Sequence, residues 1–221
     1  MHIDVKHFQV PLHAAARRRA AQEGTRGAYR ARGQGLAAPY VKSAKHLKYN
    51  PGARAVKVLA GVGHGKVLLW EYMDKKIWTG ELAAEMYSDH VAPALHGAFP
   101  GRRMWVVLED NNPTGFKSSA GLRAKAKHKI KAFQLPERSP ELNVCDFALW
   151  SEINRRMRRQ ERSWPRTKRE TRKHFLARLK RTALRLPATF VNKSVQDMRR
   201  RCNRLFAAKG HHFEEGGRGA A

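Results

Sequence analysis

Two hydrophobic periods alternate along this chain, and each predicts a different kind of element. Near-alternate apolar positions in residues 2–12, with a slip near Phe8, predict a first β-strand. Apolar runs at 56–62 and 67–72 flank a short Gly-containing turn, which predicts a β-hairpin. Further apolar runs at 104–108 and 130–135 predict two more strands, the first of them buried. We therefore expect a sheet built from these strands.

Apolar positions spaced by three and four residues predict amphipathic helices. One helix is expected to begin after Thr79, which is a suitable N-cap, to bend at Pro93 and to end at Pro100-Gly101. Its inward face consists of Leu82, Met86, Val91 and Leu95. Residues 121–129 predict a short basic helix before the last strand.

The chain is expected to be helical after the Pro-containing loop 136–143. A helix beginning at Asp146 has an inward face of Phe147, Trp150, Ile153 and Met157, so we expect Trp150 in the core. A later stripe predicts another packed helix and consists of Val191, Val195, Met198, Cys202 and Leu205. Two cysteines provide neither a disulfide framework nor a zinc pattern, so Cys145 and Cys202 are expected to pack as small apolar residues.

This order of elements predicts an α/β fold: a mixed sheet with flanking helices and a basic C-terminal helical extension. Its 221 residues suffice for one good-sized core. We expect residues 1–160 to form this core, 161–209 to form basic helices that pack on it, and 210–221 to be a disordered tail. Residues 13–54 have no sustained apolar period and are expected to be a mobile basic insertion.

The charge of the chain narrows the class of partner. Its 45 Lys and Arg residues against 18 Asp and Glu residues give a formal net charge of +27. Such an excess favours a polyanionic partner over a merely solvated basic surface. No apolar run approaches the roughly 18 residues that cross a bilayer, and no signal-peptide pattern is present, so we expect neither a membrane protein nor a secreted one.

Three acidic residues occupy positions where a carboxylate can serve chemistry. Asp110 follows the predicted strand 104–108, Asp146 opens a predicted helix, and Asp4 lies within the first predicted strand. An Asp inside a strand is costly unless it faces water, a partner or a metal. Each acid also has an ordinary structural explanation. Asp110 can form a turn with Asn111, Asp146 can favour a helix dipole, and Asp4 can face water on an edge strand.

The sequence around these acids resembles a known family. Asp4 precedes Val-Lys-His-Phe, and Glu109-Asp110-Asn111 ends a strand. The segment Ser139-Pro140-Glu141-Leu142-Asn143 precedes Asp146 and Leu149-Trp150. In this order and spacing, residues 1–209 are similar to the DDE/D transposases of the mariner-like superfamily. The resemblance implies an RNase H-like catalytic core with Asp4, Asp110 and Asp146 as its catalytic, metal-binding triad.

Some features depart from the family pattern. Gly115 stands where the family usually has His, and Val5 rather than an acid follows Asp4. Members of the family carry a helix-turn-helix DNA-binding region before the first catalytic strand, whereas only three residues precede Asp4 here. We therefore expect this region to be missing from the chain.

The resemblance also implies a reaction and its cofactor. The expected reaction is nicking at the end of a transposon, followed by attack of a 3′-hydroxyl on a target strand. Two Mg²⁺ or Mn²⁺ ions about 3.5–4 Å apart can activate the nucleophile and stabilise the leaving oxygen, and carboxylates are suitable ligands for them. Because strand side chains alternate, Glu109 is expected to point away from this site.

The expected partner is double-stranded DNA, both transposon ends and target, and a homodimer is one expected assembly. The location would be the nucleus in a eukaryote, or the cytoplasm and nucleoid otherwise. The residues expected to contact DNA are Asn111, Lys117, Ser118, Arg17, Arg18, Arg19, Arg155 and Arg158.

Two alternative functions stay open. A domesticated or truncated transposase remnant would bind nucleic acid through its basic residues without useful catalysis; Gly115 and the missing N-terminal region favour it. A basic structural protein of a ribonucleoprotein particle is a further alternative, and three convergent acids on an α/β core count against it.

Overall fold

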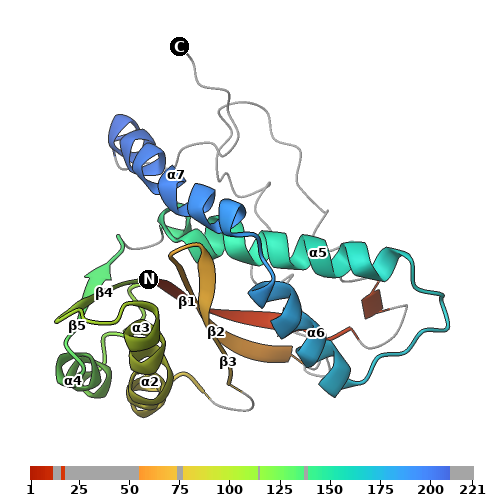
Figure 1. Cartoon of the computed structure of the whole chain (residues 1–221), viewed down its shortest axis with the longest axis horizontal. Helices are drawn as coiled ribbons and strands as arrows, with labels where there is room; N and C mark the ends of the chain where they lie inside the picture. The colour runs from red at the N-terminus through yellow and green to blue at the C-terminus, as the bar shows by residue number, and fades with distance from the viewer. Residues whose placement is uncertain (12–15, 18–54, 74–76, 114, 137–138, 210–221) are drawn as a thin grey trace, which may run out of the picture.

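The fold centres on one mixed sheet (Figure 1). The computed structural model describes residues 1–11, 16–17, 55–73, 77–113, 115–136 and 139–209. The predicted insertion at 13–54 and tail at 210–221 therefore lie almost entirely outside the described residues. The strands are β1 (His2–Gln9), β2 (Ala55–Gly63), β3 (Lys66–Tyr72), β4 (Trp105–Glu109) and β5 (Ile130–Gln134). Their order is β3-β2-β1-β4-β5, with antiparallel pairing among β1, β2 and β3 and parallel pairing of β1 with β4 and of β4 with β5.

The hairpin between β2 and β3 follows from two residues that adopt positive φ. Gly63 pairs with Lys66, and the loop between them consists of His64 (φ 50°) and Gly65 (φ 72°). Two-residue hairpins of type I′ need positive φ at both positions, because that turn matches the twist of the strands. The predicted hairpin is thus confirmed.

The helix predicted after Thr79 forms, with an irregular middle. Its parts are α2 (Gly80–Met86), the π-helical turn η2 (Tyr87–Val91) and α3 (Ala92–Ala98). The Thr79 hydroxyl accepts a 3.3 Å hydrogen bond from the Leu82 amide, as an N-cap does. Pro93 lacks an N–H, so the regular hydrogen-bond pattern is interrupted here, and the π-turn lies directly before it.

The remaining helices follow in the predicted order. They are α4 (Ser119–Lys127), the 3₁₀ turn η3 (Pro140–Leu142), the π-turn η4 (Cys145–Leu149), α5 (Trp150–Arg162), α6 (Arg172–Leu184) and α7 (Ala188–Ala207). Within the part of the chain that the structure describes, no helix is both long and apolar enough to cross a membrane.

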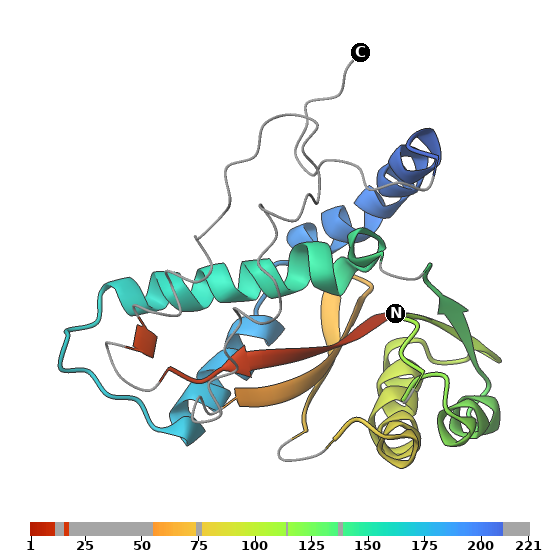
Figure 2. The ribbon, with the colours of Figure 1, turned by 180° about the vertical axis from the view of Figure 1, so that it is seen from behind.

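Each face of the sheet carries its own hydrophobic core. One core lies between β1–β3 and η4, α5, α6 and α7, and it includes Val58, Trp70, Trp150, Ile153 and Leu179. The other joins the opposite face to α2, η2, α3 and α4, and it includes Ile3, Leu59, Met86, Leu95 and Val107. Figures 1 and 2 show these two groups of helices with the sheet between them. The predicted mixed α/β fold with a basic helical extension is confirmed.

Some details differ from the sequence-based expectations. The run 104–108 is not uniformly buried, because Met104 lies outside the strand and Val106 is 45% exposed. Cys202 is exposed, and of its predicted stripe only Val191 is buried. The physical reason is that the C-terminal half of α7 extends beyond the sheet (Figure 1) and so has little to pack against.

Candidate active site

Asp4 is a buried carboxylate with one strong partner. It lies in β1 and is only 7% exposed. The indole Nε1 of Trp150, in the first turn of α5, donates a 2.7 Å hydrogen bond to Asp4 Oδ2. Trp150 is also buried, as predicted, and its ring packs edge-on against Phe8 and Trp70. The buried acid is therefore held in place by a rigid aromatic group rather than by a cation.

Asp110 lies at the end of the neighbouring strand. Parallel pairing matches His2 of β1 with Leu108 of β4, and Asp4 and Asp110 each follow that pair by two residues. Since strand side chains repeat every two residues, both acids are directed to the same face of the sheet. Asp110 is exposed, and its Oδ1 accepts a 3.1 Å hydrogen bond from the Asn112 amide. It therefore also shapes the turn after β4.

Asp146 comes from the third element, η4. The helical segment begins at Val144, so Asp146 is its third residue rather than its first. The cap is Asn143, whose Oδ1 accepts a 3.0 Å hydrogen bond from the Cys145 amide. Its Nδ2 donates a 3.2 Å hydrogen bond to the carbonyl of Ile3, the neighbour of Asp4.

Asn143 is a residue whose role sequence reasoning missed. One side chain caps the helix that carries Asp146 and fastens it to the strand that carries Asp4. An Asn three residues before a helical Asp is an N-cap signal, so the capping half of this role was available in the sequence. The link to Ile3 was not, because it spans 140 residues.

The three acids influence one another electrostatically. Burial, together with the nearby carboxylates of Asp146 and Asp110, raises the pKa of Asp4 to about 7, although hydrogen bonds from Trp150 and the Val5 backbone oppose the rise. Burial also raises the pKa of Asp146, with Asp110 adding to the rise and Lys6 opposing it. In the absence of a cation, Asp4 therefore retains its proton above the usual pH range of an Asp.

Glu109 points away from these acids, as the alternation of strand side chains predicts. It is fully buried, and it accepts hydrogen bonds from Lys125 of α4 and from the Tyr87 hydroxyl of η2. Lys125 also donates a 2.8 Å hydrogen bond to the Phe116 carbonyl. These hydrogen bonds connect the end of β4 and the loop that follows Asp110 to η2 and α4.

The residues expected to contact DNA have varied surroundings. The Asn111 amide donates to the Leu135 carbonyl, and Lys117 is half-buried in the loop after β4. The Ser118 hydroxyl caps α4: it accepts from the Gly121 amide and donates to the Gly115 carbonyl. On α5, exposed Arg155 pairs with Glu152, and Arg158 pairs with Glu161.

Three arginines of the predicted basic arm were expected to contact DNA, and the structure describes only Arg17. Arg17 is buried, its Nη2 donates a 2.7 Å hydrogen bond to the Lys168 carbonyl, and its guanidinium lies 5.1 Å from the Trp164 ring centre. Arg17 thus makes an internal contact, in which its planar guanidinium packs on an aromatic ring. Arg18 and Arg19 lie outside the described residues.

The departure at Gly115 has a steric explanation. A Cβ at Gly115 would lie 1.8 Å from Trp78 Nε1. The Trp78 ring also packs edge-on against Phe116. The indole thus occupies the space that a side chain at position 115 would need, and a His does not fit in this conformation.

The three carboxylates are of the kind that binds a hard divalent cation, although they are not arranged as a complete metal site. Three carboxylates supply the oxygen ligands that Mg²⁺ and Mn²⁺ prefer, and a cation would offset the burial and repulsion that raise the pKa values of Asp4 and Asp146. Among the described residues, no group of three or more His, Cys, Asp or Glu side chains is arranged to hold a metal ion. The donors therefore fit a metal ion in their chemistry.

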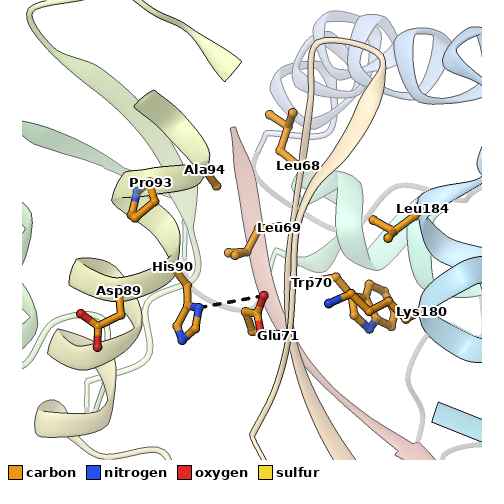
Figure 3. Close-up of a pocket in the computed structure, with 10 residues that line it drawn as sticks. All are labelled: Leu68, Leu69, Trp70, Glu71, Asp89, His90, Pro93, Ala94, Lys180 and Leu184. Carbon is orange, nitrogen blue, oxygen red and sulfur yellow. Dashed lines mark ion pairs between the residues drawn. The ribbon is translucent and has the colours of Figure 1, made fainter. Parts of the chain in front are cut away.

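A hollow of about 310 Å³ lies elsewhere, at the outer edge of β3 (Figure 3). It is lined by Leu69, Trp70, Asp89, Pro93 and Lys180, among others. The only ion pair drawn there joins His90 to Glu71 at 3.9 Å, between half-exposed side chains. None of the three acids lines this hollow, so it is not part of the candidate active site.

Comparisons with known proteins agree with this fold. No family model matches the sequence. The chain is 29% identical over 111 residues to the transposable element Tcb1 transposase of Caenorhabditis briggsae. That match covers 49% of this chain and 37% of the relative, so the chain spans little more than a third of the curated protein.

Solved structures match over more of the chain. The catalytic domain of Mos1 mariner transposase superposes with a TM-score of 0.63 at 13% identity, covering 73% of this chain and 77% of that one. The Mos1 mariner paired end complex with Mn superposes with a TM-score of 0.68 at 15% identity, covering 96% of this chain and 56% of that one. The chain therefore has the RNase H-like fold of these catalytic domains. The chain is thus similar to one transposase over half of its sequence and to the catalytic domain of another in fold.

Proposed function

We propose that this chain is a transposase catalytic domain that cuts DNA at transposon ends and joins it to target DNA, with Asp4, Asp110 and Asp146 as its catalytic acids. The observation that carries this proposal is the convergence of three carboxylates from separate elements. Asp4 and Asp110 follow a paired position on the adjacent parallel strands β1 and β4, and Asp146 lies on η4, whose start Asn143 fastens to β1. Burial and neighbouring carboxylates raise the pKa values of Asp4 and Asp146, which costs stability when both are charged. Such an arrangement is typical of a site that awaits a cation.

The three acids would hold divalent metal, either Mg²⁺ or Mn²⁺, and two ions between them would activate water or a 3′-hydroxyl and stabilise the leaving oxygen. The Mos1 transposase catalytic domain has been solved with Mn and with Mg, which supports this choice of metal. The chain's own contribution is to orient the acids. Trp150 holds Asp4, Asn143 holds the start of the helix with Asp146, and the Asn112 amide orients Asp110.

Double-stranded DNA is the proposed partner. Mos1 structures are described as complexes with a transposon end, and this chain has the charge to bind a polyanion. Residues 154–209 contain 20 Lys and Arg against three acids. Fifteen of these cations lie on α5, α6 and α7, which cover the side of the sheet that Asp4 and Asp110 face. DNA bound by these helices would thus lie on the same side as the acids. For a eukaryotic host, we propose a nuclear location.

The test separates cleavage from binding. Asp110→Ala should abolish Mg²⁺- or Mn²⁺-dependent nicking of end-containing DNA while leaving its affinity nearly unchanged, because affinity comes from Lys and Arg. The matched control is Asp89→Ala, which removes the same charge from an exposed position in η2. Nicking by the Asp110 variant at the wild-type rate would contradict the catalytic role.

The nucleic-acid-binding remnant is the second candidate. Trp78 fills the space beside Gly115, so the His that the family has at this position would not fit, and this favours the remnant. If the wild-type chain binds DNA but shows no metal-dependent nicking, even when fused to a helix-turn-helix domain, the remnant is the better description.

A further inference from the structure

The β4–β5 half of the sheet has an apolar surface on the same side as the acids. Val107 and Glu109 point into the core with α2 and α4, so Val106 and Leu108 face the other side. The parallel register pairs Val106 with Lys131 and Leu108 with Phe133, which places all four on that side. The helices of that side, α5, α6 and α7, pack mainly on one another and on β1–β3.

Large apolar side chains are consequently open to solvent there. Phe133 is 59% exposed, Met104 is 56% exposed and Val106 is 45% exposed. Exposed apolar clusters of this kind mark interaction sites more often than isolated apolar residues do.

The surface is rimmed by cations. Arg103, Lys129 and Lys131 line a shallow hollow next to Met104. Within the described part of the chain, no acidic side chain lies within ion-pair distance of these three. Lys131 and Phe133 are two residues apart on one strand, roughly 7 Å along it. A positive charge therefore stands beside an exposed aromatic ring.

This surface adjoins the candidate active site. Phe133 pairs with Leu108, which precedes Asp110 by two residues on the same face. Adjacent strands are about 5 Å apart, so the ring lies one strand over from the strand that delivers Asp110. A molecule bound on Phe133 would therefore lie beside the strand that delivers Asp110.

The positive charge around this surface indicates what kind of molecule binds there. A second copy of this chain would bring a charge of +27 and the same basic rim, so self-association through this face is opposed by repulsion. A nucleic-acid strand matches both features, because its phosphates pair with Lys and its bases stack on aromatic rings. Bases in a duplex are already stacked on their neighbours, so an exposed ring favours an unpaired base.

We propose that the exposed face of β4–β5, centred on Phe133 with Lys131 beside it, binds unpaired nucleotides of a DNA strand next to the catalytic acids. The proposal rests on the proposed function in taking DNA as the substrate. It adds that the strand at the acids is locally unpaired, and that the stacking platform comes from β5.

The test measures binding without chemistry, in EDTA, with a fluorescent single-stranded oligothymidylate and a blunt duplex as probes. Phe133→Ala should weaken single-strand affinity by about 5- to 100-fold, as loss of one stacked base does, and should leave duplex affinity within about twofold. Phe133→Trp should retain single-strand binding. Lys131→Gln should lower the slope of log affinity against log salt for the single strand by about 0.7.

The matched control is Phe206→Ala on α7, because Phe206 is another exposed Phe, 87% exposed. It should leave both affinities unchanged. Unchanged single-strand affinity in Phe133→Ala, or equal loss in the Phe206 variant, would overturn the proposal. A wild-type dimer in sedimentation that Phe133→Ala dissociates would also overturn it, since a second copy would then occupy the face. None of these outcomes depends on nicking, so the Asp110 experiment can fail or succeed independently.

Discussion

The indole Nε1 of Trp150 donates a 2.7 Å hydrogen bond to Asp4 Oδ2, across 146 residues of sequence. Trp150 lies four residues after Asp146, so this bond joins the helix that carries one acid to the strand that carries another. The hydrogen bond lowers the pKa of Asp4, against the larger effect of burial. The bond therefore both aligns two acids and favours the charged form that a cation needs.

Asp4→Asn should stabilise the metal-free protein at alkaline pH. The folded pKa of Asp4 is about 7 against a usual 3.8, so the folded state binds the extra proton between these values. The stability that this proton provides is lost as pH rises through about 7. Asn cannot ionise and still accepts the Trp150 hydrogen bond, so the variant should gain up to about 4 kcal/mol at pH 8 and little near pH 4. Urea unfolding in EDTA at both pH values measures this, and an equal gain at both would show that ionisation is not the cause.

Lys125→Met should destabilise the fold by about 3–5 kcal/mol, because it leaves the buried carboxylate of Glu109 without its cation. Glu109→Gln in the same chain should recover part of that loss, since Gln can still accept from the Tyr87 hydroxyl. The free energy of unfolding of the wild type, both single variants and the double variant forms a thermodynamic cycle. Purely additive effects would mean that the two side chains are not coupled.

Gly115→Ala should cost about 1–3 kcal/mol through overpacking against Trp78. Gly97→Ala is the matched control, because nothing lies within 4 Å of a Cβ there and the position is helical. That control should be neutral or stabilising by up to about 1 kcal/mol. Thermal unfolding of both variants gives the comparison, and equal melting temperatures would contradict the steric explanation.

Affinity for duplex DNA should fall steeply with salt. If the C-terminal helices contact six or more phosphates, counterion release predicts a loss of about 10³-fold or more between 50 and 200 mM salt. Arg155→Gln should reduce the slope by about 0.9 if this exposed residue contacts a phosphate, as predicted. Equilibrium binding over a salt series measures both values. A flat response would mean that the charge of α5–α7 serves another purpose.

Local features were predictable from the sequence. The hairpin needs only His64 and Gly65 at positive φ, and the cap of α2 needs only Thr79 three residues before Leu82. The stripe of α7 was predicted too long: its period is helical throughout, but periodicity does not tell where the neighbouring surface ends. Cys202 and Phe206 are therefore exposed on an otherwise amphipathic helix.

The sequence by itself determined the strands, the helices and the positions of three acids at or near element ends, because these depend on residues close along the chain. Only the tertiary structure decided that Asp4 accepts from Trp150, that Asn143 reaches Ile3, and that Arg17 packs on Trp164. It also decided that the face around Phe133 stays open. Each of these depends on strand order, register and the reach of a distant helix, which are set by packing between segments far apart in the chain.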